Sequence, residues 1–329
     1  MTRLATTAAT ILSLTTTAME EASRQGLRDA DIDHLLLALT LSEQPAGQVL
    51  RGLGVTLDAA REAVSAQHAA QLASLGVAAA PPRPGRITFP ETDGYRWSDR
   101  AMAVIDRASR ARGGGDASAV LRELLREPSG MIAAVLRRLG TTADQVAARL
   151  DEADRLPAAR PAARDRLAAT VAAFVPASPQ EVRRLLTDPA RLPEWDAAIA
   201  RVDGAEGSAA APGARWTAWS PTEHPDGRPI RRRHETARVV AEFLGGRDAE
   251  SVAWRFTFPD LPRANARRIE IAVEAAASGS QLSVTAGWER NPAARRVPLL
   301  PVLLRPLTRL FVWQQAQNTA AGISRALRH

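Results

Sequence analysis

The sequence contains no cysteine and no lysine, so all 43 basic residues among its 329 are arginine. The missing cysteine excludes disulfides, thiolate metal ligands and cysteine nucleophiles. The missing lysine excludes a Walker A motif and a Schiff base, so this chain by itself is not a P-loop ATPase. The longest apolar runs, such as VPLLPVLL, fall far short of the ~20 residues that span a bilayer. Threonines interrupt the apolar part of the opening segment, unlike a signal peptide, and we expect a cytoplasmic protein.

Charge is distributed unevenly along the chain. Residues 1–156 hold 18 arginines and 19 acids, whereas residues 157–329 hold 25 arginines and 17 acids. A basic half is typical of proteins that bind nucleic acid or an anionic surface. No arginine-rich helix or aromatic RNA-binding motif accompanies the charge, so we expect no nucleic-acid partner. A membrane surface is also disfavoured, because the apolar C-terminal segment that would touch it is needed for packing.

The first half of the chain repeats itself. VLRGLGV at Val49 matches VLRRLGT at Val135, an offset of 86 residues, and at this offset EASR at Glu21 falls on RASR at Arg107. Each copy, about 1–75 and 97–155, predicts a succession of four helices. In DIDHLLLALT the apolar spacing predicts an amphipathic helix with Asp31 as its N-cap. The segment between the copies is too rich in proline and glycine to be helical.

These copies resemble the double Clp-N repeat, the N-terminal domain of Clp ATPases, over residues 1–155. The first copy follows the family pattern of Glu-His before Leu-Leu-Leu-Ala-Leu, whereas the second has Ala119-Val120 at the Glu-His position. The resemblance implies an all-α domain that recruits substrates and adaptor proteins to an unfoldase. It also implies a phosphoarginine-type peptide site at Asp33, for which Ala119 is no counterpart. We expect His34 to cap or pack its helix and predict no metal site.

The second half changes to a period of two after a Pro/Ala/Arg linker at 156–166. The pattern predicts a strand in RLAATVAAFVPA, a helix capped by Ser178, and a final helix from about Pro298 to Leu327. Clean apolar alternation predicts an antiparallel sheet with one dry face. The further strands are expected at 213–220, 231–243, 251–258, 266–277 and 281–290.

This order, and above all VPASPQEVRRLLTDPARLPEWDAAI, resembles the START-like, helix-grip superfamily, also named SRPBCC or polyketide cyclase/dehydrase, over residues 167–329. The resemblance implies a curved antiparallel sheet that wraps the long C-terminal helix and leaves a cavity for an apolar small molecule. The predicted fold is therefore multidomain, with an all-α tandem repeat followed by an α+β helix-grip domain.

Two patterns select the residues expected to line this cavity. One is the alternation of apolar residues in the strands, and the other is the apolar stripe of the last helix, in which we include Leu310. The alternative is that they fill the core. Glu235 is expected to face inward, or to pair with Arg255 or Arg268 at the cavity mouth. His234 lies on the face of its strand opposite to that of Glu235, and so points away from the cavity. No catalytic residue and no cofactor are therefore predicted. The cavity candidates are Trp216, Glu235, Trp254, Phe256, Ile271, Val284, Trp288, Leu307 and Phe311.

These readings favour a non-enzymatic protein of two modules. A Clp-N-like recruiting, adaptor or decoy module would bind the Clp unfoldase, its adaptors or its substrates, and a START-like pocket would bind or sequester an apolar small molecule. One alternative is an aromatase/cyclase-like enzyme for a polyketide-type substrate, which requires polar side chains inside the cavity. Another is a protein–protein scaffold with both cores filled and no ligand.

Overall fold

The computed structural model describes residues 3–77, 85, 87, 96–111, 115–155, 168–207, 210–223, 228–230, 238–248, 250–291 and 305–328, with the side chains of 3–9 and 305–309 left aside. The chain divides into two compact units, Met1–Ala158, here called the helical unit, and Ala159–His329, the sheet unit. Each is described by itself. Within the described helices, none combines the length and apolar character that a bilayer span requires.

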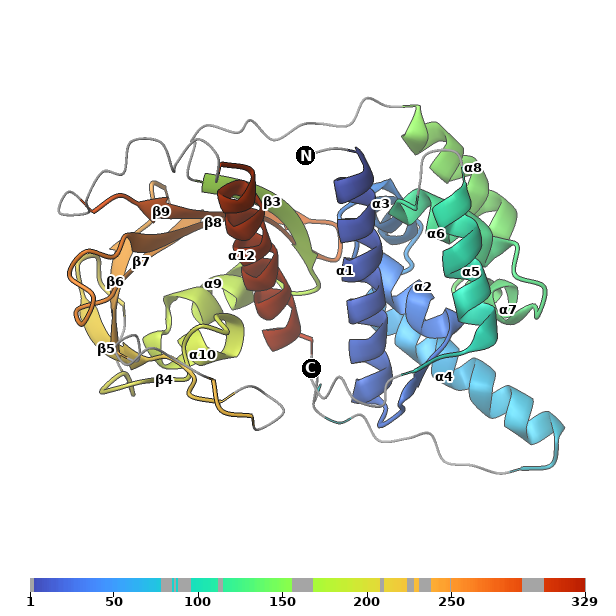
Figure 1. The fold of residues 1–329 in the computed structure, drawn as a ribbon. Helices are drawn as coiled ribbons and strands as arrows, with labels where there is room; N and C mark the ends of the chain where they lie inside the picture. The colour runs from blue at the N-terminus through green and yellow to red at the C-terminus, as the bar shows by residue number, and fades with distance from the viewer. Residues whose placement is uncertain are drawn as a thin grey trace. The chain divides into compact units, whose positions relative to one another are not determined.

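The helical unit repeats one order of helices, as predicted (Figure 1). α3 and α7 begin and end 86 residues apart, and α4 and α8 begin 86 residues apart. The short parallel pair of β1 (Asp29–Ala30) and β2 (Arg96–Trp97) connects the two copies. The helices are α1 (Arg3–Arg24), α2 (Ile32–Thr40), α3 (Pro45–Gly52), α4 (Leu57–Ser74), α5 (Asp99–Arg110), α6 (Ala117–Leu125), α7 (Met131–Arg138) and α8 (Ala143–Asp154).

The start of α2 confirms the capping prediction. The Asp31 side chain accepts a hydrogen bond from the backbone N–H of Ile32, and Nδ1 of His34 accepts one from the backbone N–H of Asp31, at 3.1 Å. Asp31 also binds Ser98 and Arg100 of the second copy. The acidic start of DIDHLLLALT therefore caps a buried helix and fastens it to its repeat.

The described strands of the sheet unit form a seven-stranded antiparallel sheet in the order β3-β9-β8-β7-β6-β5-β4, which confirms the helix-grip prediction. Of the strand expected at 231–243, the structure describes the part from Arg238, and the short β4 was not expected. The strands are β3 (Ala168–Val175), β4 (Arg201–Val202), β5 (Arg215–Trp219), β6 (Arg238–Gly245), β7 (Ser251–Thr257), β8 (Ala266–Ala276) and β9 (Gly279–Glu289).

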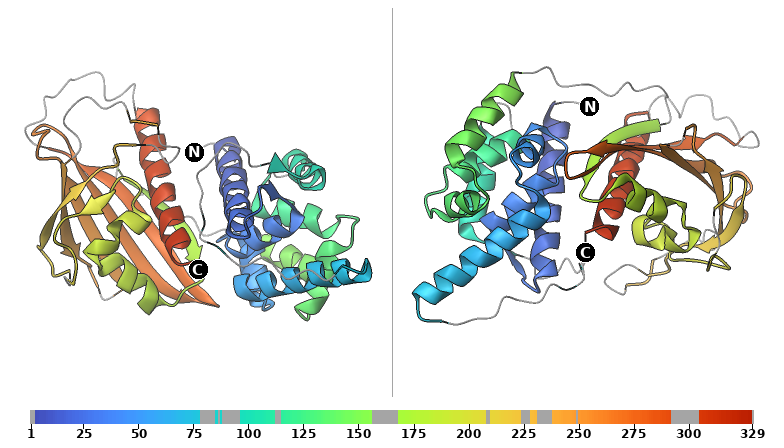
Figure 2. Two further views of the ribbon diagram at one scale, coloured as in Figure 1. Left: turned by 90° about the horizontal axis from the view of Figure 1, so that it is seen from below. Right: turned by 180° about the vertical axis from the view of Figure 1, so that it is seen from behind.

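Helices cover the inner face of this sheet. Figure 2 shows the sheet arched over α12 (Arg305–Ala326) and over the short α9 (Pro179–Thr187) and α10 (Leu192–Trp195), which flank the 3₁₀ turn η1 (Pro189–Arg191). Ser178 and Glu181 form the capping box of α9, as the sequence predicts for Ser178. α12 packs on β3 and β9, and α9 packs on β7, β8 and β9. α12 approaches α10 so closely that a Cβ at Gly322 would lie 2.2 Å from the carbonyl oxygen of Trp195.

The buried stripe of α12 differs from the predicted one. In the described part of the helix it consists of Val312, Ala316, Ala320 and Ile323, spaced three or four residues apart. Leu310 and Phe311 are 50% and 59% exposed, so the prediction that Phe311 faces an interior cavity is wrong. In the observed rotation of the helix Gly322 faces Trp195, and Phe311 points outward. The side chain of Leu307 lies outside the described part, as do residues 292–304.

Candidate functional site

Strand register brings one row of side chains together across five strands of the sheet unit. Trp216 on β5 pairs with Ala241 on β6, Ala241 with Phe256 on β7, Phe256 with Arg267 on β8, and Arg267 with Trp288 on β9. Residues that pair directly across an antiparallel sheet point to the same face. We call these five residues the aromatic row. Three of the predicted cavity residues belong to it, whereas Arg267 was not predicted.

The cross-strand rows beside the aromatic row, one of which contains Trp254, form the filled part of the core. Trp254 packs its ring against Phe243, Trp216 and Phe256, with centroids 5.1, 5.9 and 6.3 Å apart. Its Nε1–H donates to the carbonyl oxygen of Leu186 in α9, at 2.9 Å, so this tryptophan also fastens a helix to the sheet.

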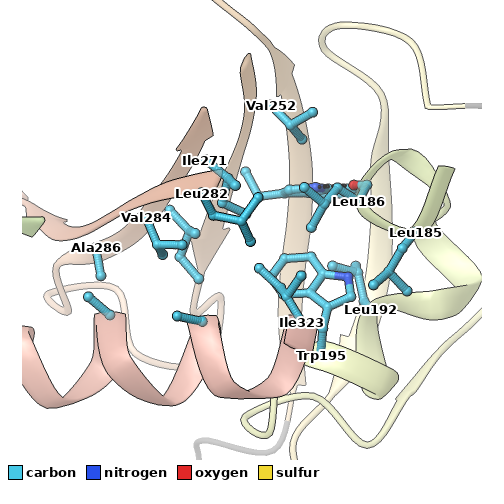
Figure 3. Packing of buried hydrophobic residues seen from close by; sticks show 14 of the residues in the cluster. Leu185, Leu186, Leu192, Trp195, Val252, Ile271, Leu282, Val284, Ala286 and Ile323 are labelled. Carbon is cyan, nitrogen blue, oxygen red and sulfur yellow. Dashed lines mark hydrogen bonds between the residues drawn. The ribbon is translucent and has the colours of Figure 1, made fainter. Parts of the chain in front are cut away.

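Two further cavity candidates, Ile271 and Val284, pair across β8 and β9 and are fully buried. Figure 3 shows them on the sheet side of a cluster that includes Leu186 of α9 and Ile323 of α12. Helices therefore already occupy the space in front of them.

The aromatic row is more accessible at its ends than in its middle. Trp216 and Trp288 are half-buried, whereas Ala241 and Phe256 are fully buried. Phe258, also half-buried, stacks on Trp288 with centroids 6.4 Å apart. The row thus reaches solvent at its two ends, Trp216 and Trp288, and is buried in between.

Trp219 lies on the opposite face of β5 from Trp216, as alternation requires. Its Nε1–H donates to Asp203 at 2.6 Å, and the Arg201 guanidinium lies 4.7 Å from its ring centroid. Of these two tryptophans, therefore, Trp216 alone belongs to the candidate site.

One member of the aromatic row, Arg267, belongs to a buried ion pair. Nη1 of Arg267 donates to Oδ1 of Asp196 at 3.0 Å, and Nη2 donates to Oδ2. Asp196 directly follows α10, and its Oδ1 also accepts from the backbone N–H of Ala198 at 3.1 Å. The side chains are 5% and 3% exposed. The Arg267 guanidinium lies 4.2 Å from the ring centroid of Phe256. The sequence did hold an indication of the position of Arg267. It lies two residues before Ile269 in the same strand, so alternation places both side chains on the inner face.

The outer face of the sheet carries paired charges. Arg215 binds Glu242, Arg255 binds Glu289 and lies 3.8 Å from Glu242, and Arg268 binds Glu289. Arg255 and Arg268, which were considered as partners for an inward Glu235, thus bind acids of the outer face. Glu235 itself lies outside the described residues.

In the helical unit, Asp33 lies enclosed at the start of α2. Its carboxylate is 2% exposed, and its Oδ2 lies 3.1 Å from Nε2 of His68 on α4. Burial raises the pKa of Asp33, but contacts with His34 and His68 outweigh it and hold that pKa well below its usual range. The hydrogen bond with Asp33 in turn raises the pKa of His68. Within the described parts of the chain, no group of three or more acids and histidines is arranged to hold a metal ion.

The second copy uses a different pair at this place. The caps of α2 and α6, Asp31 and Asp116, are 85 residues apart, because the loop after α6 is one residue longer than its equivalent. The structural counterpart of Asp33 is therefore Ser118 and not Ala119, which corrects the sequence alignment. Ser118 donates to Asp154 at 3.0 Å, and Asp154 lies 86 residues after His68.

Comparisons with known proteins assign the sheet unit. Residues 166–312 match the family described as "Polyketide cyclase / dehydrase and lipid transport". No curated protein matches the chain.

Similar solved structures include protein CV1439 from Chromobacterium violaceum, with 15% identity over 48% of this chain and 96% of that chain and a TM-score of 0.31. Ara h 8.0201 has 16% identity over 48% and 94%, with a TM-score of 0.33. The N-terminal domain of the caseinolytic protease associated chaperone ClpD from Arabidopsis thaliana has 21% identity over 43% and 90%, with a TM-score of 0.33. Similarities this weak assign no function. The family match leaves the helical unit unassigned, whereas the C-terminal part of the chain is a polyketide cyclase-like domain of the SRPBCC type.

Proposed function

We propose that this chain is a two-module binding protein whose sheet unit holds an apolar or amphipathic small molecule against the aromatic row. The observation that carries the proposal is the row itself, which holds three aromatic side chains, is half-buried at Trp216 and Trp288, and has one polar member, Arg267. Small-molecule sites are typically apolar surfaces with a few well-placed polar groups. The description of the matching family, which includes lipid transport, supports the same reading.

The charged groups of the inner face of the sheet favour binding over catalysis. Arg267 is the one charged residue that the described strands place there, and its partner Asp196 already accepts hydrogen bonds on both carboxylate oxygens. A carboxylate held in this way is poorly suited to take a proton from a substrate. The same inward pair is the observation that favours the second candidate, an aromatase/cyclase-like enzyme. Turnover of a polyketide-type substrate that stops in Asp196→Asn would support that candidate.

For the helical unit we propose a Clp-N-like adaptor or decoy role, supported by its two copies of one helix order. A compound or protein captured by one module would then be presented or sequestered together with the other module's partner. Phosphoarginine recognition by Asp33 is part of this proposal and requires His68 to leave the carboxylate. Calorimetric titration of wild type and Asp33→Asn with free phosphoarginine tests it, and equal heats from the two proteins would contradict it.

Native mass spectrometry of the full chain, purified from its own host, tests the small-molecule proposal. We expect a retained apolar compound and, after its extraction, quenching of tryptophan fluorescence when 2-acetylnaphthalene is added. Trp216→Phe should reduce this quenching. Trp219→Phe is the matched control, because Trp219 lies on the other face of the same strand. A bare polypeptide that shows no response to a panel of lipids and aromatic polyketide analogues would contradict the proposal.

A further inference from the structure

Helix α4 is longer than its counterpart in the second copy. α8 ends at Asp154, which corresponds to His68 at the offset of 86 residues, whereas α4 continues past His68 to Ser74. Residues 69–77, here called the arm, are all exposed. Figures 1 and 2 show the end of α4 extending past the other helices of its unit. The packing that the two copies share therefore does not require the arm.

The arm is apolar and carries no charge. Leu72, Leu75 and Val77 are 37%, 77% and 48% exposed, and they make up three of the eight large apolar side chains that are exposed among the described residues. Residues 63–82 contain no aspartate, glutamate or arginine, although 24% of the whole chain is charged. The last turn of α8, in contrast, holds three acids. Single exposed apolar side chains are common, but a cluster of them without charges is typical of the centre of an interface.

The missing charge indicates which partner fits the arm. A charged partner would lose hydration there and find no opposite charge, since the histidine of residues 63–82, His68, faces Asp33. In a symmetric dimer each surface meets its own copy, so a charge near the two-fold axis would face an identical charge. The whole chain has a formal net charge of +7, and at the arm two copies can meet without adding to their repulsion. Leu72 lies at the middle of residues 63–82, so two antiparallel arms would bring these uncharged residues of both copies together.

We propose that the arm is a self-association surface, through which two copies of this chain form an antiparallel pair of helices centred near Leu72. The association is weak, because residues 69–77 are far fewer than the about 20–30 residues that each side of a stable interface contributes. Its dissociation constant is on the order of 10–100 μM, so the chain is mainly monomeric when dilute and dimeric when concentrated.

Sedimentation equilibrium of the full chain between about 2 and 200 μM tests the proposal. The average mass of wild type should rise with concentration from near 35.2 kDa toward that of a dimer. Leu72→Glu and Leu72→Lys should each stay monomeric, because two like charges would meet at the centre of the pair. An equimolar mixture of the two variants should associate again, because opposite charges then meet.

The matched control is Leu12→Glu, since Leu12 on α1 is 66% exposed and lies outside the arm. It should associate as wild type does, and circular dichroism checks that the helices of every variant are intact. Wild type that remains monomeric at the highest concentration would overturn the proposal and leave the arm to a different protein or to another part of this chain. Association that persists in both Leu72 variants, that is lost in Leu12→Glu, or that the mixture fails to restore would equally overturn it.

Discussion

Breaking the Asp196–Arg267 pair from one side should strongly destabilise the sheet unit. The two side chains are 3% and 5% exposed, and without Arg267 the Asp196 carboxylate would keep, among the described residues, the backbone N–H of Ala198 as its one donor. A buried charge left without its partner costs about 3–5 kcal/mol of unfolding free energy. Replacing both partners in D196L/R267M removes both charges, so the double variant should lie within about 1 kcal/mol of wild type or above it. The costs of the single variants should therefore not add.

Tryptophan fluorescence during urea unfolding measures this effect. Six of the seven tryptophans lie in the sheet unit, and Trp97 is the exception, so fluorescence mainly follows the unit that contains the pair. The full chain can be used even if the two units unfold separately. With a slope of about 2 kcal/mol per molar urea, the loss in Arg267→Met should lower the midpoint by about 1.5–2.5 M. A shift in Arg267→Met below about 0.3 M, or a double variant as unstable as the sum of the single ones, would refute the reasoning.

Two further predictions concern one contact in each unit. The pKa of His68 is raised by its hydrogen bond with Asp33, so that contact stabilises the folded helical unit fully below about pH 6.5 and is lost as the pH rises through the raised pKa of His68. Helical circular dichroism during urea unfolding should show this decline in wild type and not in His68→Gln, and equal declines would contradict it. Gly322→Ala should destabilise the sheet unit by about 1–3 kcal/mol, because its Cβ would overlap the Trp195 carbonyl, whereas Gly52→Ala, with nothing within 4 Å, should stabilise α3 by up to about 1 kcal/mol. A wild-type urea midpoint in Gly322→Ala would contradict the second prediction.

The local sequence pattern was sufficient to predict the strands and the helix caps. Alternation placed Phe256 and Trp288 on the inner face, because side chains of a strand point to opposite faces in turn, but it did not decide which of Trp216 and Trp219 faces inward. Asp31 and Ser178 were recognised as caps, because a capping side chain binds backbone groups within three residues of itself. The family resemblance of the second half rested on the same local features, and the family match confirms it.

Features that depend on distant contacts were missed or wrongly assigned. Arg267 shares the face of Ile269, but its role becomes visible only with Asp196, which lies 71 residues away in the chain. Phe311 was assigned to the buried stripe because it lies four residues after Leu307, but Val312 begins a second row with the same spacing, and periodicity does not choose between the two.

The sequence by itself therefore determined the order of the elements and the faces of the strands, because a period of two or of 3.6 residues is a property of neighbouring positions. Only the tertiary structure decided which side of α12 is buried, that Ser118 is the counterpart of Asp33, and that a charged pair lies inside the sheet. These depend on the close approach of α12 to α10, on the length of one loop and on a contact between the end of α10 and β8. Each is set by how separate elements pack, which no local pattern of residues encodes.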